Sequence, residues 1–174
     1  MATKTKDPES NHIMGYKDPV EVKNILLSKA EALQDKAIGE YKEILNKATY
    51  NNVRDLVSGL ISLAEDEKRI MKKLKDGSWS KTVYFDGTSG SLENSLFEHL
   101  LDQGEKKPKE NDISAIIMYA LNISTKLNTL YYLLLNEYSH SAIKNSFRAL
   151  QEIESNKIKR LDKLYEALVV KGAY

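Results

Sequence analysis

The chain has 174 residues, 29% of them charged and 41% hydrophobic, and its 26 basic and 25 acidic side chains leave a net charge of +1. This balance argues against nucleic acid or an anionic membrane surface as a partner, and the absence of cysteine excludes disulfides and thiolate metal sites. The first residues lack an apolar run, and the most apolar stretch, 113–135, is interrupted by polar residues. We therefore expect a cytoplasmic protein without a secretory signal or a membrane span.

The first predicted helix follows a polar segment. Residues 1–17 lack a repeating apolar pattern, and we expect a flexible arm there, before a single domain over 18–174. Asp18 followed by Pro19 is a typical helix start, because proline fits the first helical position. Apolar residues then recur every three or four positions as far as Ala48, which predicts one long helix.

A second helix and a long connection come next. Asn51 or Asn52 can cap a helix that ends at Asp76, where a glycine follows as a typical stop. The connection, residues 77–111, begins with a turn-rich stretch and ends with a polar one. Between them, residues 92–101 have the pattern of a short extra helix.

The last part of the chain predicts a second pair of helices. We place a third helix over 112–138, with Asp112 or Ser114 as its N-cap, and a fourth over 139–170, with a serine N-cap. The links within each pair are short, so both pairs should be antiparallel hairpins. The sequence therefore predicts an all-α four-helix bundle of two hairpins, 18–76 and 112–170, joined by a long crossover, 77–111.

The third helix is apolar around most of its circumference, notably over 131–135. A bundle helix normally keeps one polar face for water. We interpret the excess as a second buried surface and expect a homodimer through this helix, with a further, unidentified protein partner as an option. The alternative is that the crossover covers the surface.

Two glutamates interrupt the apolar faces of the second and fourth helices. Residues 63–74 align without gaps on residues 150–161, and this alignment places Glu67 on Glu154. The first helices of the hairpins align as well, with Tyr41 on Tyr132, and we expect both tyrosines to flank the core. Seven residues before these tyrosines are Gln34 and Thr125, with Ser124 as an adjacent candidate. The chain is therefore a two-fold repeat with a carboxylate at the same place in each half.

These features resemble the rubrerythrin-type, ferritin-like proteins over roughly residues 20–74 and 112–168. The resemblance rests on the tyrosine-bearing first helix, on SLAEDEKRI and its repeat ALQEIESNK, and on the crossover. It implies a ferritin-like bundle. In that family each hairpin supplies one Glu and one Glu-x-x-His, which together hold two iron or manganese ions for peroxide or oxygen chemistry.

The expected ligand set is incomplete in this chain. Glu67 and Glu154 match the two Glu-x-x-His glutamates, as a vestigial metal site. The remaining four ligand positions hold Gln34, Ile70, Thr125 (or Ser124) and Lys157. Two divalent ions need several carboxylates and imidazoles, and a lysine ammonium repels metal ions. The resemblance thus supports the ferritin-like fold, but it does not support the metal-dependent activity of the family.

Four interpretations of the glutamates follow. Lys157 can neutralise them, or one carboxyl can be protonated and donate to the other, or a single metal ion can bind between them. In the fourth, both lie at the bundle edge in water. We favour a metal-free polar network of buried residues, because buried polar groups normally have partners: Gln34, Glu67, Ser124, Thr125, Glu154 and Lys157.

The leading functional hypothesis is therefore a non-enzymatic, ferritin-like interaction or structural module without a cofactor. The alternative is a rubrerythrin-like oxidoreductase with an atypical iron or manganese site at Glu67 and Glu154. A third possibility is a small-molecule pocket in the bundle centre, lined by Tyr41, Ile70 and Leu127.

Overall fold

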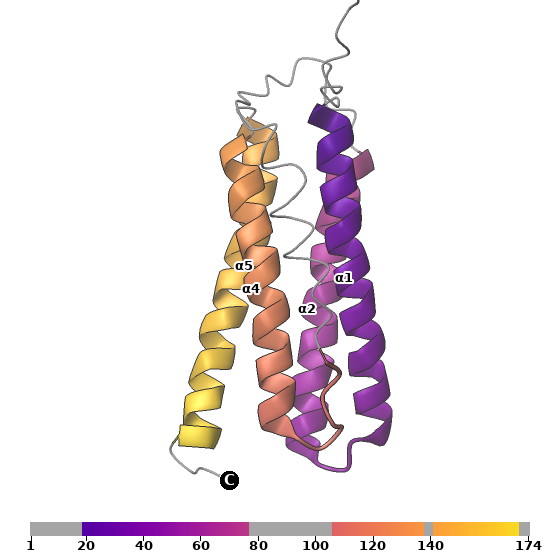
Figure 1. The fold of residues 1–174 in the computed structure, drawn as a ribbon, viewed down its shortest axis with the longest axis vertical. Helices are drawn as coiled ribbons and strands as arrows, with labels where there is room; N and C mark the ends of the chain where they lie inside the picture. The colour runs from indigo at the N-terminus through magenta and orange to yellow at the C-terminus, as the bar shows by residue number, and fades with distance from the viewer. Residues whose placement is uncertain (1–18, 77–105, 138–140, 171–174) are drawn as a thin grey trace, which may run out of the picture.

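A computed structural model describes residues 19–76, 106–137 and 141–170 of the chain. Within these ranges every regular element is helical, and four long helices pack together (Figure 1). This confirms the predicted all-α class and four-helix bundle. The predicted arm and the short helix at 92–101 lie outside the described residues. The helices are α1 (Pro19–Lys47), α2 (Asn51–Asp76), α4 (Ile113–Glu137) and α5 (Ser141–Tyr165), and α5 continues into a π-helical turn, η1 (Glu166–Val170).

Local hydrogen bonds fix where two of the helices begin. Asp112 caps α4 as predicted, since its Oδ1 accepts a hydrogen bond from the backbone N of Ala115 at 2.9 Å. Asn52, by contrast, lies inside the first turn of α2, where its Oδ1 accepts from the backbone N of Val53 at 2.9 Å. α2 therefore begins at Asn51 itself, one residue before the start that an N-cap at Asn51 would give.

The turn between α1 and α2 is also held by side chains. Arg54 donates through Nη1 to the carbonyl oxygens of Leu45 and Ala48, at 3.0 and 3.2 Å, and so satisfies carbonyls at the end of α1. The backbone N of Thr49 donates to Oδ1 of Asn111 at 3.1 Å. This contact ties the residues just before α4 to the α1–α2 turn.

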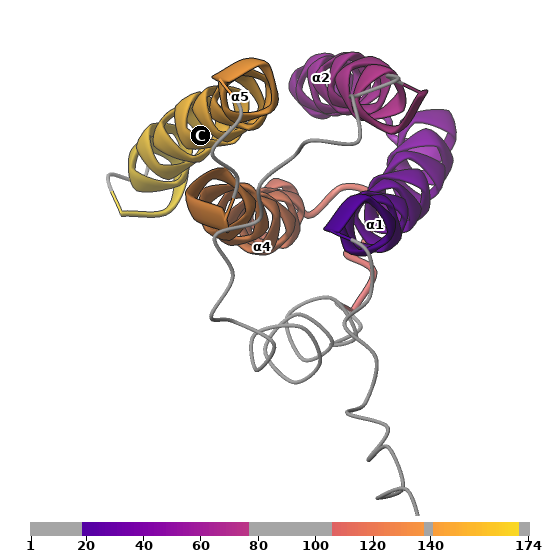
Figure 2. The ribbon, with the colours of Figure 1, turned by 90° about the horizontal axis from the view of Figure 1, so that it is seen from above.

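The helices form a square in which α1 packs on α2 and α4 on α5, while the hairpins meet through α2 with α5 and α1 with α4 (Figure 2). α4 begins at the end of the bundle where α1 turns into α2, and α2 ends at the opposite end (Figure 1). α2 and α4 therefore run in the same direction, and the link between the hairpins joins opposite ends of the bundle.

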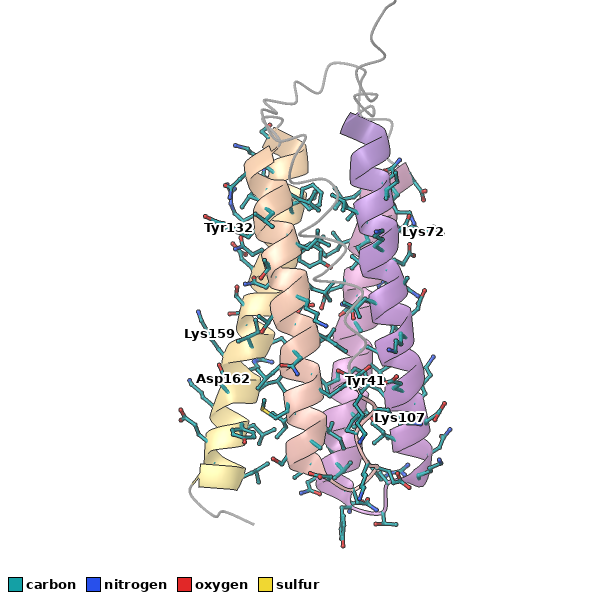
Figure 3. The ribbon with its side chains drawn as sticks, viewed as in Figure 1. Tyr41, Lys72, Lys107, Tyr132, Lys159 and Asp162 are labelled. Atoms are coloured by element: carbon teal, nitrogen blue, oxygen red, sulfur yellow. The ribbon has the colours of Figure 1, made fainter. Side chains whose placement is uncertain are left out.

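The inner faces of all four helices supply one hydrophobic core, in which the side chains of Leu27, Met71, Leu127 and Phe147 are wholly buried. Side chains also cover the outer faces of the helices (Figure 3). No helix in the described ranges combines the length and apolar character needed to cross a bilayer. Among the described residues, six polar or charged ones are buried as well: Gln34, Glu67, Ser124, Lys126, Glu154 and Lys157.

Candidate functional site

Four of the buried polar residues form one group, here called the central cluster: Gln34 of α1, Glu67 of α2, and Glu154 and Lys157 of α5. The helical repeat explains why Glu67 points inward, because it lies one turn from Ala64 and from Met71 on the buried stripe of α2. Glu67 and Glu154 have no solvent-exposed surface. The interpretation that placed both glutamates in water at the bundle edge is therefore wrong.

Lys157 and Gln34 are the hydrogen-bond donors of the cluster. Nζ of Lys157 donates to Oε1 of Glu67 at 2.7 Å and to Oε1 of Glu154 at 3.0 Å. Nε2 of Gln34 donates to Oε2 of Glu67 at 2.7 Å and, more weakly, to Oε1 of Glu154 at 3.5 Å. Both oxygens of Glu67 thus have donors. Oε2 of Glu154 is buried without a hydrogen-bond partner.

The charges of the cluster do not balance if every group is ionised, since two carboxylates face one ammonium. Burial raises the pKa of Glu67 well above its usual value, the charge of Glu154 raises it further, and Lys157 offsets only part of the increase. Burial alone would lower the pKa of Lys157, but the charges of Glu154 and Glu67 outweigh it and the pKa is raised. The cluster therefore keeps the lysine charged and favours one proton on the carboxyl pair, which makes it neutral.

Two tyrosines flank the cluster, and one of them differs from the prediction. Tyr41 and Tyr131 are buried, and burial raises the pKa of each hydroxyl, with smaller increases from the nearby glutamate charges. Tyr132, which was expected beside the cluster, is 52% exposed. The phase of α4 is thus shifted by one residue, or about 100° around the helix.

The same shift decides between Ser124 and Thr125. Thr125 is exposed, so its predicted place in the polar core is wrong, whereas Ser124 is buried. Ser124 precedes Tyr131 by seven residues, as Gln34 precedes Tyr41. The corrected repeat therefore pairs Ser124 with Gln34 and Tyr131 with Tyr41.

The donor set does not fit the two-metal centre that the resemblance implies. The ammonium of Lys157 contacts both carboxylates, where a bridging cation would have to bind. Ile70, at the other expected histidine position, is half-buried against the hydrophobic core. No three side chains of His, Cys, Asp or Glu within the described ranges are grouped so that they could hold a metal ion.

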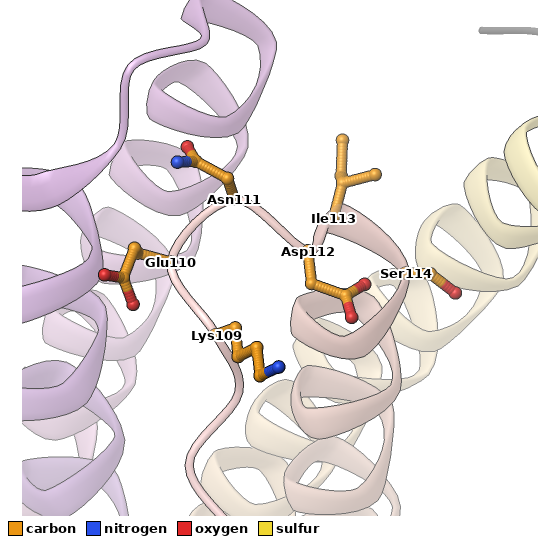
Figure 4. A pocket seen from close by; sticks show the side chains of 6 residues that line it. All are labelled: Lys109, Glu110, Asn111, Asp112, Ile113 and Ser114. Carbon is orange, nitrogen blue, oxygen red and sulfur yellow. The ribbon is translucent and has the colours of Figure 1, made fainter.

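A second feature lies at the start of α4, where one stretch of chain lines a hollow that is open to solvent (Figure 4). Its lining combines a basic side chain with acidic ones, so it presents no single charge to a ligand. The described residues that line it are consecutive, and no side chain of another helix is among them: Lys109, Glu110, Asn111, Asp112, Ile113 and Ser114.

Comparisons with protein-family models, with curated proteins and with solved structures find no match to this chain. The resemblance to rubrerythrin-type proteins therefore stays a prediction that rests on the quoted motifs.

Proposed function

We propose that this chain is a non-enzymatic, ferritin-like helical module in which a lysine ammonium takes the place of a metal centre. One observation carries the proposal: Nζ of Lys157 lies 2.7 Å from Glu67 and 3.0 Å from Glu154, with all three side chains buried. A single cation supplied by the chain, together with one proton on the carboxyl pair, neutralises the inward carboxylates.

Electrostatics favours this occupant over a metal ion. A divalent cation at the carboxylates would face the Lys157 charge at a few ångströms in a medium of low dielectric constant, where repulsion is strong. Loss of the lysine proton would relieve that repulsion, but the raised pKa of Lys157 opposes it. Gln34 adds only a neutral amide oxygen, a weak ligand for a hard cation.

The function then depends on the surface of the bundle, because Lys157 takes the place of a metal ion at the centre. We assign the module an interaction or structural role, with the outward face of α4 as its contact surface. Met118 and Tyr132 are large hydrophobic residues on that face, and both are exposed.

One observation favours the alternative, a rubrerythrin-like oxidoreductase with a single iron or manganese ion. Oε2 of Glu154 is buried without a partner, and buried polar atoms normally have one. In our proposal the carboxyl pair retains one proton, and one carboxyl hydrogen-bonds to the other. In the alternative, this oxygen of Glu154 is a metal ligand.

Metal content distinguishes the two. The protein is incubated anaerobically with Fe(II) or Mn(II), desalted and submitted to elemental analysis beside a Glu67→Gln/Glu154→Gln double variant. We expect the same near-zero metal content in both proteins. Near-stoichiometric metal in the wild type that disappears in the double variant would overturn the proposal, and peroxide turnover would then be assayed.

A further inference from the structure

The two hairpins are more closely packed within themselves than against each other. The backbones of α1 and α2 are in close contact along the first hairpin, as are those of α4 and α5 along the second, whereas contact through α2 with α5 and α1 with α4 is much sparser. The views along and across the bundle show the same division into two pairs of helices (Figure 1, Figure 2). The boundary between the pairs, here called the hairpin seam, is where the helices are least closely joined.

Each hairpin also has polar contacts of its own. Lys75 of α2 forms an ion pair with Glu31 of α1. In the second hairpin, Oγ of Ser155 on α5 donates to Oδ1 of Asn128 on α4 at 3.1 Å. These contacts do not involve the hairpin seam, so they would persist if the two hairpins moved apart.

The central cluster crosses the hairpin seam, but its hydrogen bonds are divided evenly between the hairpins. Within the first hairpin, Nε2 of Gln34 donates to Glu67 at 2.7 Å, and within the second, Nζ of Lys157 donates to Glu154 at 3.0 Å. Across the seam, the same Nζ donates to Glu67 at 2.7 Å and the same Nε2 to Glu154 at 3.5 Å. Separation of the hairpins would break only the bonds across the seam.

This division lowers the cost of moving the hairpins apart. A buried carboxylate that loses all its donors is strongly destabilising, but here Gln34 stays with Glu67 and Lys157 stays with Glu154. Glu67, the carboxylate that would lose its cation, would gain water in exchange. The backbone hydrogen bonds of the helices are also kept, because they lie within each helix.

Two contacts of aromatic residues cross the hairpin seam as well. The rings of Tyr41 and Tyr119 meet edge to face, with their centroids 5.8 Å apart. The hydroxyl of Tyr131 lies 4.0 Å from Sδ of Met71, and a thioether sulfur is a weak acceptor. Met71 is wholly buried and contacts the second hairpin, so its position reports on whether the seam is closed.

We infer that the bundle opens along the hairpin seam, with the two hairpins moving apart as units far enough to admit water and small solutes to the central cluster. Proteins open in cooperative units of this kind where contacts are least dense. The inference goes beyond the proposed function, since it supplies a route to a site that is buried in the closed bundle. It is independent of the metal measurement, because the opening requires no ion at the cluster.

Thiol labelling tests the opening, because the chain has no cysteine of its own. Met71→Cys places a thiol at the hairpin seam. If the hairpins move as units, iodoacetamide reaches this thiol while α2 stays helical. Amide hydrogen exchange around residue 71 of the same variant measures the opening that unfolds the helix. We expect the opening constant from labelling to exceed that from amide exchange about tenfold or more.

An exposed position supplies the reference rate. Ser62→Cys lies on the exposed side of α2 and gives the labelling rate of an accessible thiol, from which the opening constant of Met71→Cys is calculated. Equal opening constants from labelling and from amide exchange would mean that reagents reach position 71 only when the helix unfolds. That result would overturn the inference.

Two lysine variants, each combined with Met71→Cys, distinguish the seam from the rest of the bundle. Lys157→Met removes a bond that the opening breaks and should raise the labelling rate about tenfold or more. Lys75→Met removes the ion pair with Glu31, which the closed and open states share, so the labelling rate should change by less than about twofold.

Equal increases for the two lysine variants would show that labelling follows global unfolding, and would also overturn the inference. Circular dichroism shows whether each variant keeps its helix content. If Lys157→Met does not fold, the comparison of labelling with amide exchange in Met71→Cys alone decides.

Discussion

The two hairpins of this bundle are alike inside and different outside. On the inner faces, Glu67 in the first hairpin corresponds to Glu154 in the second, and both are wholly buried. The resemblance ends one turn later, where Ile70 corresponds to Lys157. The first hairpin thus brings a carboxylate without a counter-charge, and the second brings the lysine that serves both.

The outer faces differ more strongly. Residues of α1 form ion pairs with α2, as in Lys68 with Asp35 and Lys75 with Glu31. α4 exposes Met118 and Tyr132 instead. The inner faces are alike because they share one core, whereas each outer face is free to follow its own surroundings. In the first hairpin these surroundings are water, whereas on α4 we propose a contact with a partner.

Of the changes that test this comparison, removal of Lys157 should lower the free energy of unfolding the most. Lys157→Ala leaves two buried carboxylates without their cation, and we expect a loss of about 3–5 kcal/mol in the free energy of unfolding. Lys159→Ala is the matched control, because Lys159 is exposed on the same helix; its cost should stay below about 0.5 kcal/mol. Urea denaturation at pH 7 measures both. Similar losses for the two variants would contradict a role for Lys157 in charge compensation.

Replacement by glutamine should destabilise the protein to different extents at the two equivalent glutamates. In Glu67→Gln, the new NH₂ group must face Gln34 or Lys157, both of which are donors to Glu67. In Glu154→Gln, the NH₂ group can replace Oε2, which has no partner. We expect Glu67→Gln to cost about 1–3 kcal/mol more than Glu154→Gln, the cost of an opposed buried donor. Equal midpoints in urea would show that the hairpins are equivalent in energy as well as in sequence.

The raised pKa of Glu67 predicts how stability depends on pH. The folded chain keeps a proton that the unfolded chain loses above the ordinary value of 4.5, so stability should fall as the pH rises from that value toward the folded pKa. The slope for one proton is at most about 1.4 kcal/mol per pH unit. Urea titrations at several pH values measure it.

Variants assign that slope to the cluster. Glu67→Gln should remove this part of the pH dependence, because an amide does not titrate. Glu65→Gln, on the exposed face of α2, should retain it. A wild-type stability that rises with pH over this window would show that both carboxyls are ionised in the folded protein.

The smallest effect is expected on the outer face of the first hairpin. Lys42 and Glu65 form an ion pair at 3.8 Å, with both side chains more than half exposed. Lys42→Ala should lower the free energy of unfolding by less than about 0.5 kcal/mol, since water and salt screen such pairs. A double-mutant cycle with Glu65→Ala measures the coupling. A coupling energy as large as the loss in Lys157→Ala would mean that the buried charges contribute no more to stability than the exposed ones.

Much of the fold could be predicted, because α2 and α5 are clearly amphipathic. In these helices a single apolar stripe fixes the helical phase, so the sequence alone places Glu67, Glu154 and Lys157 on inner faces. α4 is the exception. It is apolar around most of its circumference, so its periodicity does not determine a phase, and this is why Tyr132 and Thr125 were predicted inside in place of Tyr131 and Ser124. The separation of seven residues between Gln34 and Tyr41, applied to Tyr131, would have found Ser124.

The sequence by itself determined the four helices, the two-fold repeat and the unusual presence of carboxylates in apolar stripes, because each of these depends on local periodicity. Only the tertiary structure decided which groups meet. Lys157 and Glu67 are 90 residues apart in the chain, and their contact exists because α2 packs on α5. The packing also decided that both donors, Lys157 and Gln34, reach Oε1 of Glu154 and that neither reaches its Oε2.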